Sequence, residues 1–424
     1  MPAENSNSRT VQTTCCIVGG GPAGMVLGFL LARAGVDVQV LEKHADFLRD
    51  FRGDTIHPST FELMYELGLL DDFLRRPHQQ LTEIGAAIEN TTVTVADFSH
   101  LPTHCKFVGL MPQWDFLNFV AEKARAYPEF HSRMESEVTG LTLENGRVAG
   151  VRATTKEGGL EVRADLVVGA DGRHSLVRKQ AGFEVIDLGA PIDVLWMRIH
   201  REKSDPGQTL GRFHAGKILV TLDRGDYWQC AYVIAKGAFD EIKQKGLPVF
   251  REDLETIAPF LRGRTTELKD WSDIKLLSVS VDRLRQWSRT GLLCIGDSAH
   301  AMSPFGGVGI NLAIQDAVAA ANALAQPLLE HAPLDEPCRG IQKRREFPTK
   351  ITQGAQVFAH KHFIWPALRH KTPVRQLPLL LRLLQEFPEL RRIPARLVGI
   401  GVRPEHIHTP DAHRHPATQL ASQS

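Results

Sequence analysis

The sequence has few cysteines, almost no net charge and no long apolar run. Six of its 424 residues are cysteines and none forms a Cys-x-x-Cys pair, so we expect neither a metal site nor a disulfide framework. The formal net charge of +1 argues against a nucleic-acid binder. No apolar run reaches the roughly 18 residues of a membrane span, and the polar first twelve residues do not resemble a secretory signal. We therefore expect a reduced, cytoplasmic protein.

What the sequence does contain is ordinary for a soluble globular protein, with 43% hydrophobic and 23% charged residues. At this length the chain can form two or three structural units with a sizeable core. Three glycine-containing turns, each placed directly after an apolar strand-like run, indicate how those units are organised.

The first turn lies near the N-terminus, between an apolar strand at residues 13–18 and an apolar helical pattern that reaches Leu31. Its sequence is Gly19-Gly20-Gly21-Pro22-Ala23-Gly24, and a second strand ends at Glu42. A G-x-G-x-x-G turn between strand and helix, with an acid about 20 residues further on, predicts a dinucleotide site. The glycines let the backbone approach a pyrophosphate at the helix N-terminus, and Glu42 accepts hydrogen bonds from the adenosine ribose. An accidental tight turn is the weaker interpretation.

The last turn follows an apolar run that begins at Leu292 and ends in Gly296-Asp297. Glycines at 306, 307 and 309 allow a ligand to approach the backbone closely. A helix is predicted over residues 310–325, and its free N–H groups and positive dipole point out of the turn. Such a helix end suits an anion or an electron-rich ring. Between the two turns, residues 166–170 predict a buried strand that ends in Asp171-Gly172, which is another acid beside a glycine.

Two polar residues between these turns have open roles. Arg52 lies ten residues past Glu42; it is either a solvated surface charge or, as we favour, a phosphate contact. Gln113 stands just before a helix predicted over residues 114–127, and it is either a cofactor contact or a helix-cap residue.

The composition changes between residues 185 and 284, where long β-rich runs appear at 193–200, 212–222, 227–234 and 276–283. One helix, over 251–261, interrupts them. This pattern predicts an inserted, mostly antiparallel sheet that covers a pocket above the nucleotide domain. The candidate pocket residues are Trp196, Arg198, His214, Gln229 and Tyr232, although each is more typical of an ordinary core or surface position. Strand alternation places Trp196 and Arg198 on one face.

After residue 340 the chain is helical and basic, with thirteen Lys and Arg against three Glu over residues 341–403. We favour packing helices with solvated arginines. The alternative is contact with an anionic membrane surface or an apolar partner. Residues 404–424 are polar and are expected to form a disordered tail.

Together the three turns resemble those of the group A flavoprotein monooxygenases, the p-hydroxybenzoate hydroxylase-like family, over residues 13–365. The resemblance implies an α/β fold with a Rossmann-like FAD-binding domain, an inserted substrate sheet and C-terminal helices. We assign residues 10–80, 100–184 and 286–340 to the FAD-binding domain, 81–99 and 185–285 to the substrate sheet, and 341–403 to the C-terminal helices. Serines stand at 298 and 303, where alanine and proline are common in the family.

The family's site residues carry over to matching positions of this sequence. Gly19, Gly21, Pro22, Ala23 and Gly24 match the pyrophosphate cradle, Glu42 with Lys43 the ribose region, and Arg52 and Gln113 contacts to the phosphate and ribityl regions. Asp171 matches an acid implicated in both FAD and NAD(P)H binding. Gly296 and Asp297 match the ribityl site, and Pro304, Gly307, Gly309, Ile310 and Asn311 match the turn beside the flavin ring. His57 is a weak further candidate, and His300 is expected to support the Asp297 loop.

By this resemblance the protein is an FAD-dependent monooxygenase that consumes NAD(P)H and O2. A flavin C4a-hydroperoxide would transfer oxygen to an aromatic or electron-rich apolar small molecule. The protein is expected to be a monomer or a homodimer. Two alternatives remain: a peripheral-membrane hydroxylase of a prenylated quinol precursor, motivated by the basic C-terminal span, and a flavin dehydrogenase that does not activate oxygen.

Overall fold

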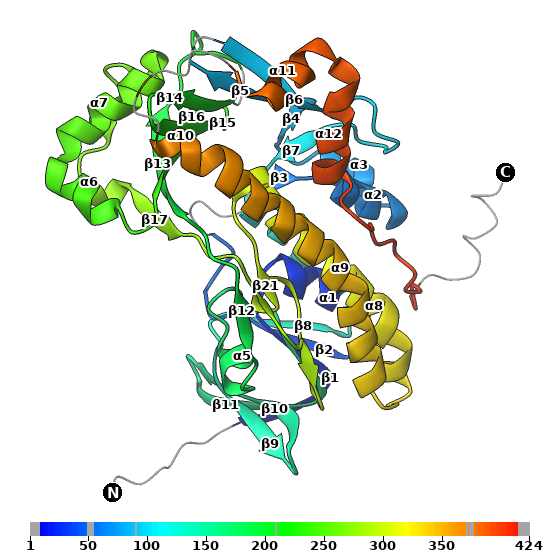
Figure 1. Ribbon diagram of the computed structural model, residues 1–424. Coiled ribbons are helices and arrows are strands. Elements are labelled where there is room, and N and C mark those ends of the chain that lie inside the picture. Colours follow the sequence, from blue (N-terminus) through cyan, green and yellow to red (C-terminus); the bar gives the residue numbers. More distant parts are fainter. Residues whose placement is uncertain are drawn as a thin grey trace, which may run out of the picture.

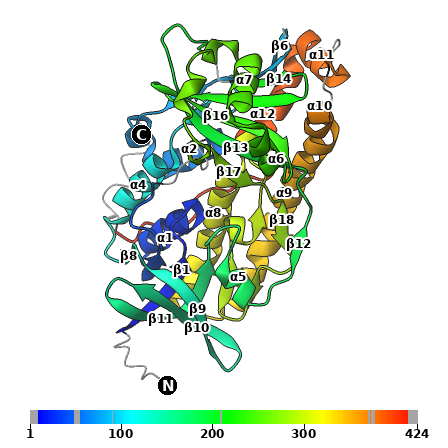
Figure 2. The ribbon, with the colours of Figure 1, turned by 90° about the vertical axis from the view of Figure 1, so that its left-hand side faces the viewer.

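The structure of the chain is a computed structural model, and it describes residues 9–48, 55–89, 91–207, 210–369, 372 and 377–413. Two sheets lie at opposite ends of an elongated molecule, and the long helix α9 (Asp335–Ala359) runs between them (Figures 1 and 2). The glycine turns belong to the lower sheet of Figure 1, and the β-rich insert forms the upper one.

The lower sheet has a parallel centre and an antiparallel edge. Its parallel strands are β20 (Leu292–Cys294), β11 (Gly158–Gly169), β1 (Arg9–Val18), β2 (Val38–Leu41) and β8 (Phe130–Arg133), in that spatial order. The antiparallel strands are β19 (Ser288–Arg289) beside β20, β10 (Arg147–Thr155) beside β11, and β9 (Glu137–Glu144) beside β10. The centre of a parallel sheet is buried on both faces, which explains the unbroken apolar runs at residues 15–18 and 166–168.

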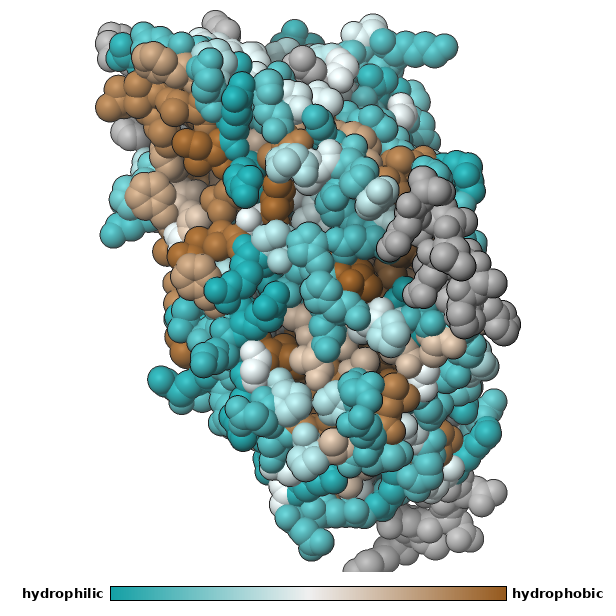
Figure 3. All heavy atoms as spheres, turned by 90° about the vertical axis from the view of Figure 1, so that its right-hand side faces the viewer, coloured by the Kyte–Doolittle hydropathy of each residue, from teal (hydrophilic) through white to brown (hydrophobic). Residues whose placement is uncertain are grey.

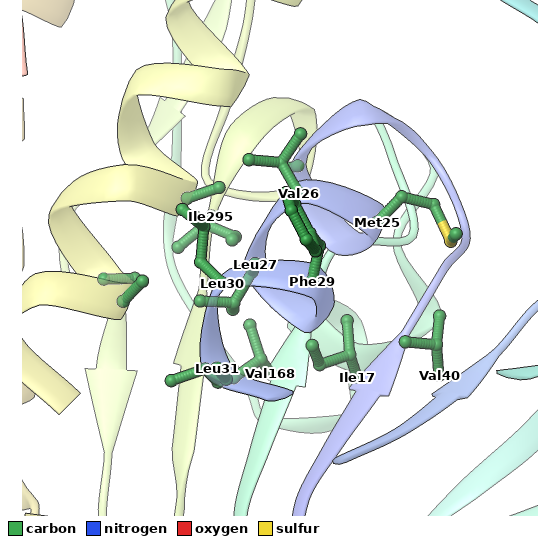
Figure 4. Packing of buried hydrophobic residues seen from close by; sticks show 14 of the residues in the cluster. Ile17, Met25, Val26, Leu27, Phe29, Leu30, Leu31, Val40, Val168 and Ile295 are labelled. Atoms are coloured by element: carbon green, nitrogen blue, oxygen red, sulfur yellow. The ribbon is translucent and has the colours of Figure 1, made fainter. Parts of the chain in front are cut away.

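Helix α1 (Pro22–Arg33) packs on this sheet and against α4 (Gln113–Ala124) and α8 (Gly309–Leu329). Figure 4 shows apolar side chains of α1 directed toward Ile17 and Val168 on the strands. The helix comes close because it carries Gly28, where a Cβ atom would lie 2.9 Å from Val40 Cγ2. The short helix α5 (Leu176–Gln180) follows β11.

One described helical stretch, Phe305–Leu329, is long and apolar enough to cross a membrane, but 67% of its most apolar window is buried inside the fold. Burial of this kind is typical of a core helix. Helix α8 therefore forms the core of the lower unit together with α1.

The upper sheet contains the insert. Its spatial order is β17 (Lys275–Ser278), β13 (Ile192–His200), β16 (Tyr227–Ala235), β15 (Lys217–Asp223), β14 (Leu210–His214), β5 (Glu83–Ile88) and β6 (Thr91–Asp97). All its pairings are antiparallel except β14 with β5. Helices α6 (Phe239–Lys245) and α7 (Leu247–Ile257) lie beside the strands, and α7 covers one face. The mostly antiparallel insert is therefore present as predicted.

Three boundaries in the insert differ from the sequence expectation. Residues 212–222 form a hairpin, because Ala215 and Gly216 both adopt positive φ and reverse the chain. Residues 276–283 are divided: β17 stays in the upper sheet, whereas β18 (Asp282–Leu284) joins a small sheet with β12 (Val185–Asp187) and β21 (His300–Ala301). Helix α7 begins four residues before the expected start and ends at Ile257.

A second small sheet lies between the two large ones. It consists of β3 (Thr55–Ile56), β7 (Val108–Leu110) and β4 (Gln79–Leu81), accompanied by α2 (Pro58–Glu66) and α3 (Leu70–Leu74). The strand β3 contacts α8, so this sheet lies beside the late glycine turn.

The C-terminal region is helical, as predicted. Helix α9 continues into a π-helical turn (His360–Ile364) and α10 (Trp365–Arg369), and α11 (Leu379–Glu386) and α12 (Arg392–Gly399) pack on β6. The expectation of a disordered tail from residue 404 is wrong for residues 404–413, which lie against the body of the fold. Glu405 is buried in an ion pair with Arg345, and Arg33 donates to the carbonyl oxygen of Thr409. These contacts hold residues 404–413 against the body of the fold.

Candidate cofactor and substrate site

The first glycine turn forms a backbone cradle at the N-terminus of α1. A Cβ at Gly19 would lie 2.4 Å from the Ala170 carbonyl oxygen, and one at Gly24 would lie 2.0 Å from the Gly19 carbonyl oxygen. Both positions therefore require glycine. Gly21 instead faces open space, and the first turn of α1 carries no acidic side chain and no side-chain cap. Its free N–H groups and positive dipole suit a pyrophosphate.

Glu42 lies beside this cradle at the end of β2. One carboxylate oxygen accepts from the Gly20 N–H at 2.8 Å, and the other accepts from the His44 N–H at 3.1 Å. The carboxylate is thus oriented toward the turn. Lys43 is exposed, and Arg52 lies outside the described residues.

The two strand-end acids follow the neighbouring parallel strands β11 and β20. Arg173, two residues after Asp171, approaches Asp297 with 3.4 Å between Nη2 and Oδ2, and its Nη1 is buried without a hydrogen-bond partner among the described residues. Asp171 accepts from the Val177 N–H at 3.1 Å, while its Oδ1 is buried and has no partner in the described part of the chain. Burial raises the pKa of the Asp171 carboxyl. Orphaned buried polar atoms are rare in folded proteins, so their convergence here points to a polar ligand.

The serine at 298 has a structural reason. Its hydroxyl lies 2.5 Å from the Gly169 carbonyl oxygen and 2.8 Å from that of Ile295, so it connects the ends of β11 and β20. Alanine, which is common at this position in the family, has no hydroxyl and would make neither of these hydrogen bonds.

The late glycine turn is fixed to the small sheet through Asn311. Its Oδ1 accepts from the His57 N–H at 2.9 Å and from Thr60 Oγ1 at 2.8 Å, and its Nδ2 donates to the Thr55 carbonyl oxygen at 3.1 Å. Because its side chain is bonded to the protein, Asn311 has only its backbone N–H to offer a cofactor. Thr55 Oγ1 also donates to the Gly307 carbonyl oxygen at 2.9 Å. The first turn of α8 carries no acidic residue and no side-chain cap.

Helix α9 holds the other side of this turn. Gln356 accepts from the Ser303 N–H at 3.1 Å and donates to the carbonyl oxygens of Ser303 and Phe305, both at 2.9 Å. The Ser303 hydroxyl lies 2.9 Å from His360 Nε2 and accepts from the Phe305 N–H. A proline at 303 would have neither the N–H nor the hydroxyl. Ser303, which stands where proline is common in the family, therefore takes part in the hydrogen bonds by which α9 and His360 clamp this turn.

A buried ionic network lies below the Asp297 loop. Asp316 accepts from the Gly296 N–H at 3.1 Å, and its carboxylate lies 2.5 Å from His300 Nε2 and 2.9 Å from Arg345 Nε. Arg345 Nη1 in turn lies 3.1 Å from Glu405 Oε1. Burial alone raises the pKa of Asp316, but His300 and Arg345 outweigh it and hold the pKa below its usual range. His300 thus supports the Asp297 loop, as expected.

The upper sheet presents two different faces. Tyr232 lies on the face covered by α7, where its ring packs on Phe250 at 5.3 Å and burial raises the pKa of its hydroxyl. Trp196 lies on the opposite face and shares it with Arg198 and Gln229, which are paired across β13 and β16. That face also packs on Ile364 and α10, which continue α9.

The remaining candidate pocket residues have other roles. His214 forms an ion pair with Glu89 at 2.5 Å at the end of its hairpin. His57 is buried, its Nδ1 lies 2.7 Å from the Val398 carbonyl oxygen, and burial lowers its pKa to about 4. The ring of His57 is therefore neutral near pH 7 and is held by α12. Gln113 is the first residue of α4.

Comparison with known proteins agrees with this geometry. A family model described as an FAD binding domain matches residues 12–355. The chain is 33% identical over 391 residues to 6-methylpretetramide 4-monooxygenase of Streptomyces rimosus, a match that covers 91% of this chain and 92% of that protein. The chain belongs to the FAD-dependent monooxygenases.

Solved structures of two such enzymes share the fold. p-Nitrophenol 4-monooxygenase PnpA of Pseudomonas putida has a TM-score of 0.72 at 20% identity, with 92% of this chain and 94% of that chain covered. OxyS anhydrotetracycline hydroxylase of Streptomyces rimosus has a TM-score of 0.71 at 22% identity, with 96% and 78% covered. The resemblance to group A flavoprotein monooxygenases is therefore confirmed.

The residues of this chain fit FAD. The turn leaves open space at Gly21 for a pyrophosphate, and Glu42 stands where a ribose would follow. The orphaned atoms of Asp171 and Arg173 and the uncapped end of α8 then offer polar contacts further along an extended cofactor. This FAD-dependent monooxygenase also uses residues that sequence inspection missed. Gln356 and Arg345 lie in α9, and the only feature of this segment that the sequence indicated was its excess of basic residues.

Proposed function

We propose that this protein is an NAD(P)H-dependent monooxygenase that hydroxylates a polycyclic phenol of the aromatic polyketide type. The observation that carries the proposal is that the ends of the neighbouring strands β2, β1, β11 and β20 bring the glycine turns and the acids Asp171 and Asp297 to one edge of the lower sheet. Near full-length identity of 33% to 6-methylpretetramide 4-monooxygenase supports the substrate class. Cofactor contacts are proposed for the residues of the three turns, with Arg52 and Gln113 as further candidates.

The sheet face that carries Trp196 supports a flat aromatic substrate. Trp196 offers a large apolar ring, and Val220 and Ala231 continue the apolar surface beside it. Arg198 and Gln229 stand at one end of this surface and can bind acidic or carbonyl oxygens. We propose that the apolar part selects fused rings and that the polar end orients them.

Bound FAD supplies the transfer of two electrons from NAD(P)H and the reaction with O2. One oxygen atom would enter a carbon–hydrogen bond of the substrate, and the other would be reduced to water with the hydride of NAD(P)H, which carries two electrons and one proton, and one further proton. The chain's own contribution is position and electrostatics. The free N–H groups at the start of α8 would stabilise negative charge on the flavin ring of bound FAD. The Asp316 network keeps the Asp297 loop in place.

The test is substrate-stimulated consumption of NADH and NADPH by FAD-loaded protein, screened over polycyclic and single-ring phenols in 18O2. We expect polycyclic phenols to stimulate consumption and to gain one labelled oxygen atom. Oxidised product without labelled oxygen would instead identify a dehydrogenase, and no stimulation by any phenol would refute the proposed substrate class.

A binding control separates the cofactor site from the substrate site. Asp297→Ala should lose FAD on gel filtration, because it removes the acid that Arg173 approaches in the site. Trp196→Ala should retain FAD but lose the stimulation by polycyclic phenols. Full FAD retention by folded Asp297→Ala would show that the cofactor is placed elsewhere.

A further inference from the structure

From Arg345 onward, helix α9 presents mainly polar residues on its buried side. Arg345, Thr349, Gln353 and Gln356, followed by His360 at the start of the π-helical turn, succeed one another at helical spacing and are at most 4% exposed. Gln353 donates to the carbonyl oxygens of Asp282 and Ala301, as Gln356 does to the segment that follows. These side chains satisfy the backbone of the Asp297 loop and its turn, which an apolar stripe would leave unpaired.

Cys338 and Ile341 in the first half of α9 are buried in the core, but three large apolar residues further along the helix lie on its outer side. Phe347, Ile351 and Phe358 follow at spacings of four and seven residues, and they are 50%, 42% and 54% exposed. A solvated helix normally has the opposite arrangement, with the apolar stripe inward. The outer side of α9 is thus a surface that the described residues leave uncovered.

Exposed apolar side chains recur on the helices that follow. Half of the sixteen large apolar side chains exposed in the described residues lie on these C-terminal elements: Phe347, Ile351 and Phe358 of α9, Leu379 and Leu380 of α11, Phe387, and Ile393 and Leu397 of α12. We call these eight residues the apolar face. In Figure 3 hydrophobic side chains gather along the upper left, the side on which Figures 1 and 2 place α9, α10 and α11.

Arginines are interleaved with this face. On α12 the exposed residues are Arg392 and Arg396 together with Ile393 and Leu397, so charge and apolar surface alternate within two turns. Arg382 is exposed on α11. Long basic side chains beside apolar ones can keep their charge in a polar layer while their neighbours enter an apolar one.

We propose that the apolar face docks this enzyme on the surface of an anionic phospholipid bilayer. An interface with exposed apolar residues and adjacent arginines matches the boundary between acyl chains and negatively charged headgroups. A second copy of this chain is a poorer match, because a two-fold contact would bring the arginines of both copies together. The proposal is independent of the substrate class proposed above.

The experiment is sedimentation of the FAD-loaded full chain with phosphatidylglycerol–phosphatidylcholine vesicles and with phosphatidylcholine vesicles. We expect co-sedimentation with the first and much less with the second, and weakening between about 0.05 M and about 0.5 M NaCl as charges are screened. Failure to sediment with the anionic vesicles at the lower salt concentration would overturn the proposal.

Two variants separate the apolar contribution to vesicle binding from the contribution of the basic side chains. Ile393→Glu/Leu397→Glu should lower the partition coefficient for anionic vesicles at least about tenfold, since it places carboxylates where apolar side chains enter. Arg392→Gln/Arg396→Gln should lower it about tenfold or more, because each basic residue near an anionic surface contributes roughly a fivefold gain. This second variant keeps the apolar residues, so it tests the charge contribution alone.

The matched control is Leu143→Glu/Leu329→Glu, which adds the same two charges at residues that are 57% and 43% exposed and lie outside the apolar face. We expect it to bind vesicles as the unaltered chain does. FAD content and thermal midpoint verify folding of every variant. If light scattering shows a dimer that Ile393→Glu/Leu397→Glu converts to a monomer, while vesicles are not bound, the face is a self-interface and the proposal is wrong.

Discussion

Replacing Arg345 by methionine should lower the free energy of unfolding by about 3–5 kcal/mol, because a buried charge pair loses one partner. Arg345 is 1% exposed and lies within ion-pair distance of both Asp316 and Glu405. Methionine fills a similar volume without charge, so the variant leaves two buried carboxylates with one cation fewer. Arg344→Met is the matched control. Arg344 also pairs with Glu405 but is 52% exposed, so its loss should cost less than about 1 kcal/mol.

The pH dependence of this loss has a defined sign. His300 and Arg345 hold the pKa of Asp316 below its usual range against the effect of burial. A carboxyl with a lowered folded pKa stabilises the fold above its unfolded pKa of about 4, and that stabilisation is lost as the pH falls through the folded value. The difference between the unaltered chain and Arg345→Met should therefore be largest near neutral pH and should narrow below about pH 4.

Urea unfolding followed by tryptophan fluorescence measures both quantities. A double-mutant cycle with Glu405→Gln then separates the two carboxylates, since Arg345→Met should cost less in that background. Two results would refute the reasoning: a loss no greater than that of Arg344→Met, or a difference that stays constant from neutral to acidic pH.

Two further substitutions test the turn that α9 clamps, with flavin absorbance after desalting as the measurement. Ser303→Pro should weaken FAD retention by about tenfold or more, because the N–H bonded to Gln356 and the hydroxyl are both lost, whereas Ser303→Ala keeps the N–H and should lose less. Gly307→Ala should prevent FAD loading, because its Cβ would lie 2.3 Å from Thr55 Oγ1. Gly306→Ala is its control: φ is also positive there, but the nearest atom is 3.7 Å away, so equal loss in both variants would exclude the clash as the cause.

The parts of the site that sequence predicted are those made by short stretches of backbone. The glycine spacing from 19 to 24, with Glu42 at the next strand end, determines a strand, a turn and a helix within one segment. The acids at 171 and 297 were also predicted, because each directly follows a buried strand. Parallel neighbours bring such strand ends to one edge, so local patterns were sufficient to predict a common site.

The sequence did not determine which candidate pocket residues of the insert lie on a covered face. The alternation along a strand shows which residues share a face but not which face another element covers. Trp196 and Arg198 share a face, as alternation requires. Tyr232 was grouped with them, yet it points to the other side, where α7 packs. Only the position of α7 separates the two faces, and that position depends on residues distant in sequence.

Helix α9 also shows that a sequence pattern alone does not determine which side of an element is buried. Its sequence alternates polar and apolar stripes, and the usual rule assigns the apolar stripe to the core. Here the segment that α9 covers, residues 282–305, presents carbonyl and N–H groups that need partners, so the polar stripe lies inward. Phe347, Ile351 and Phe358 are then left on the outer side. Their exposure is therefore a consequence of how α9 holds the Asp297 loop and the late glycine turn, which makes their surface available for a second role.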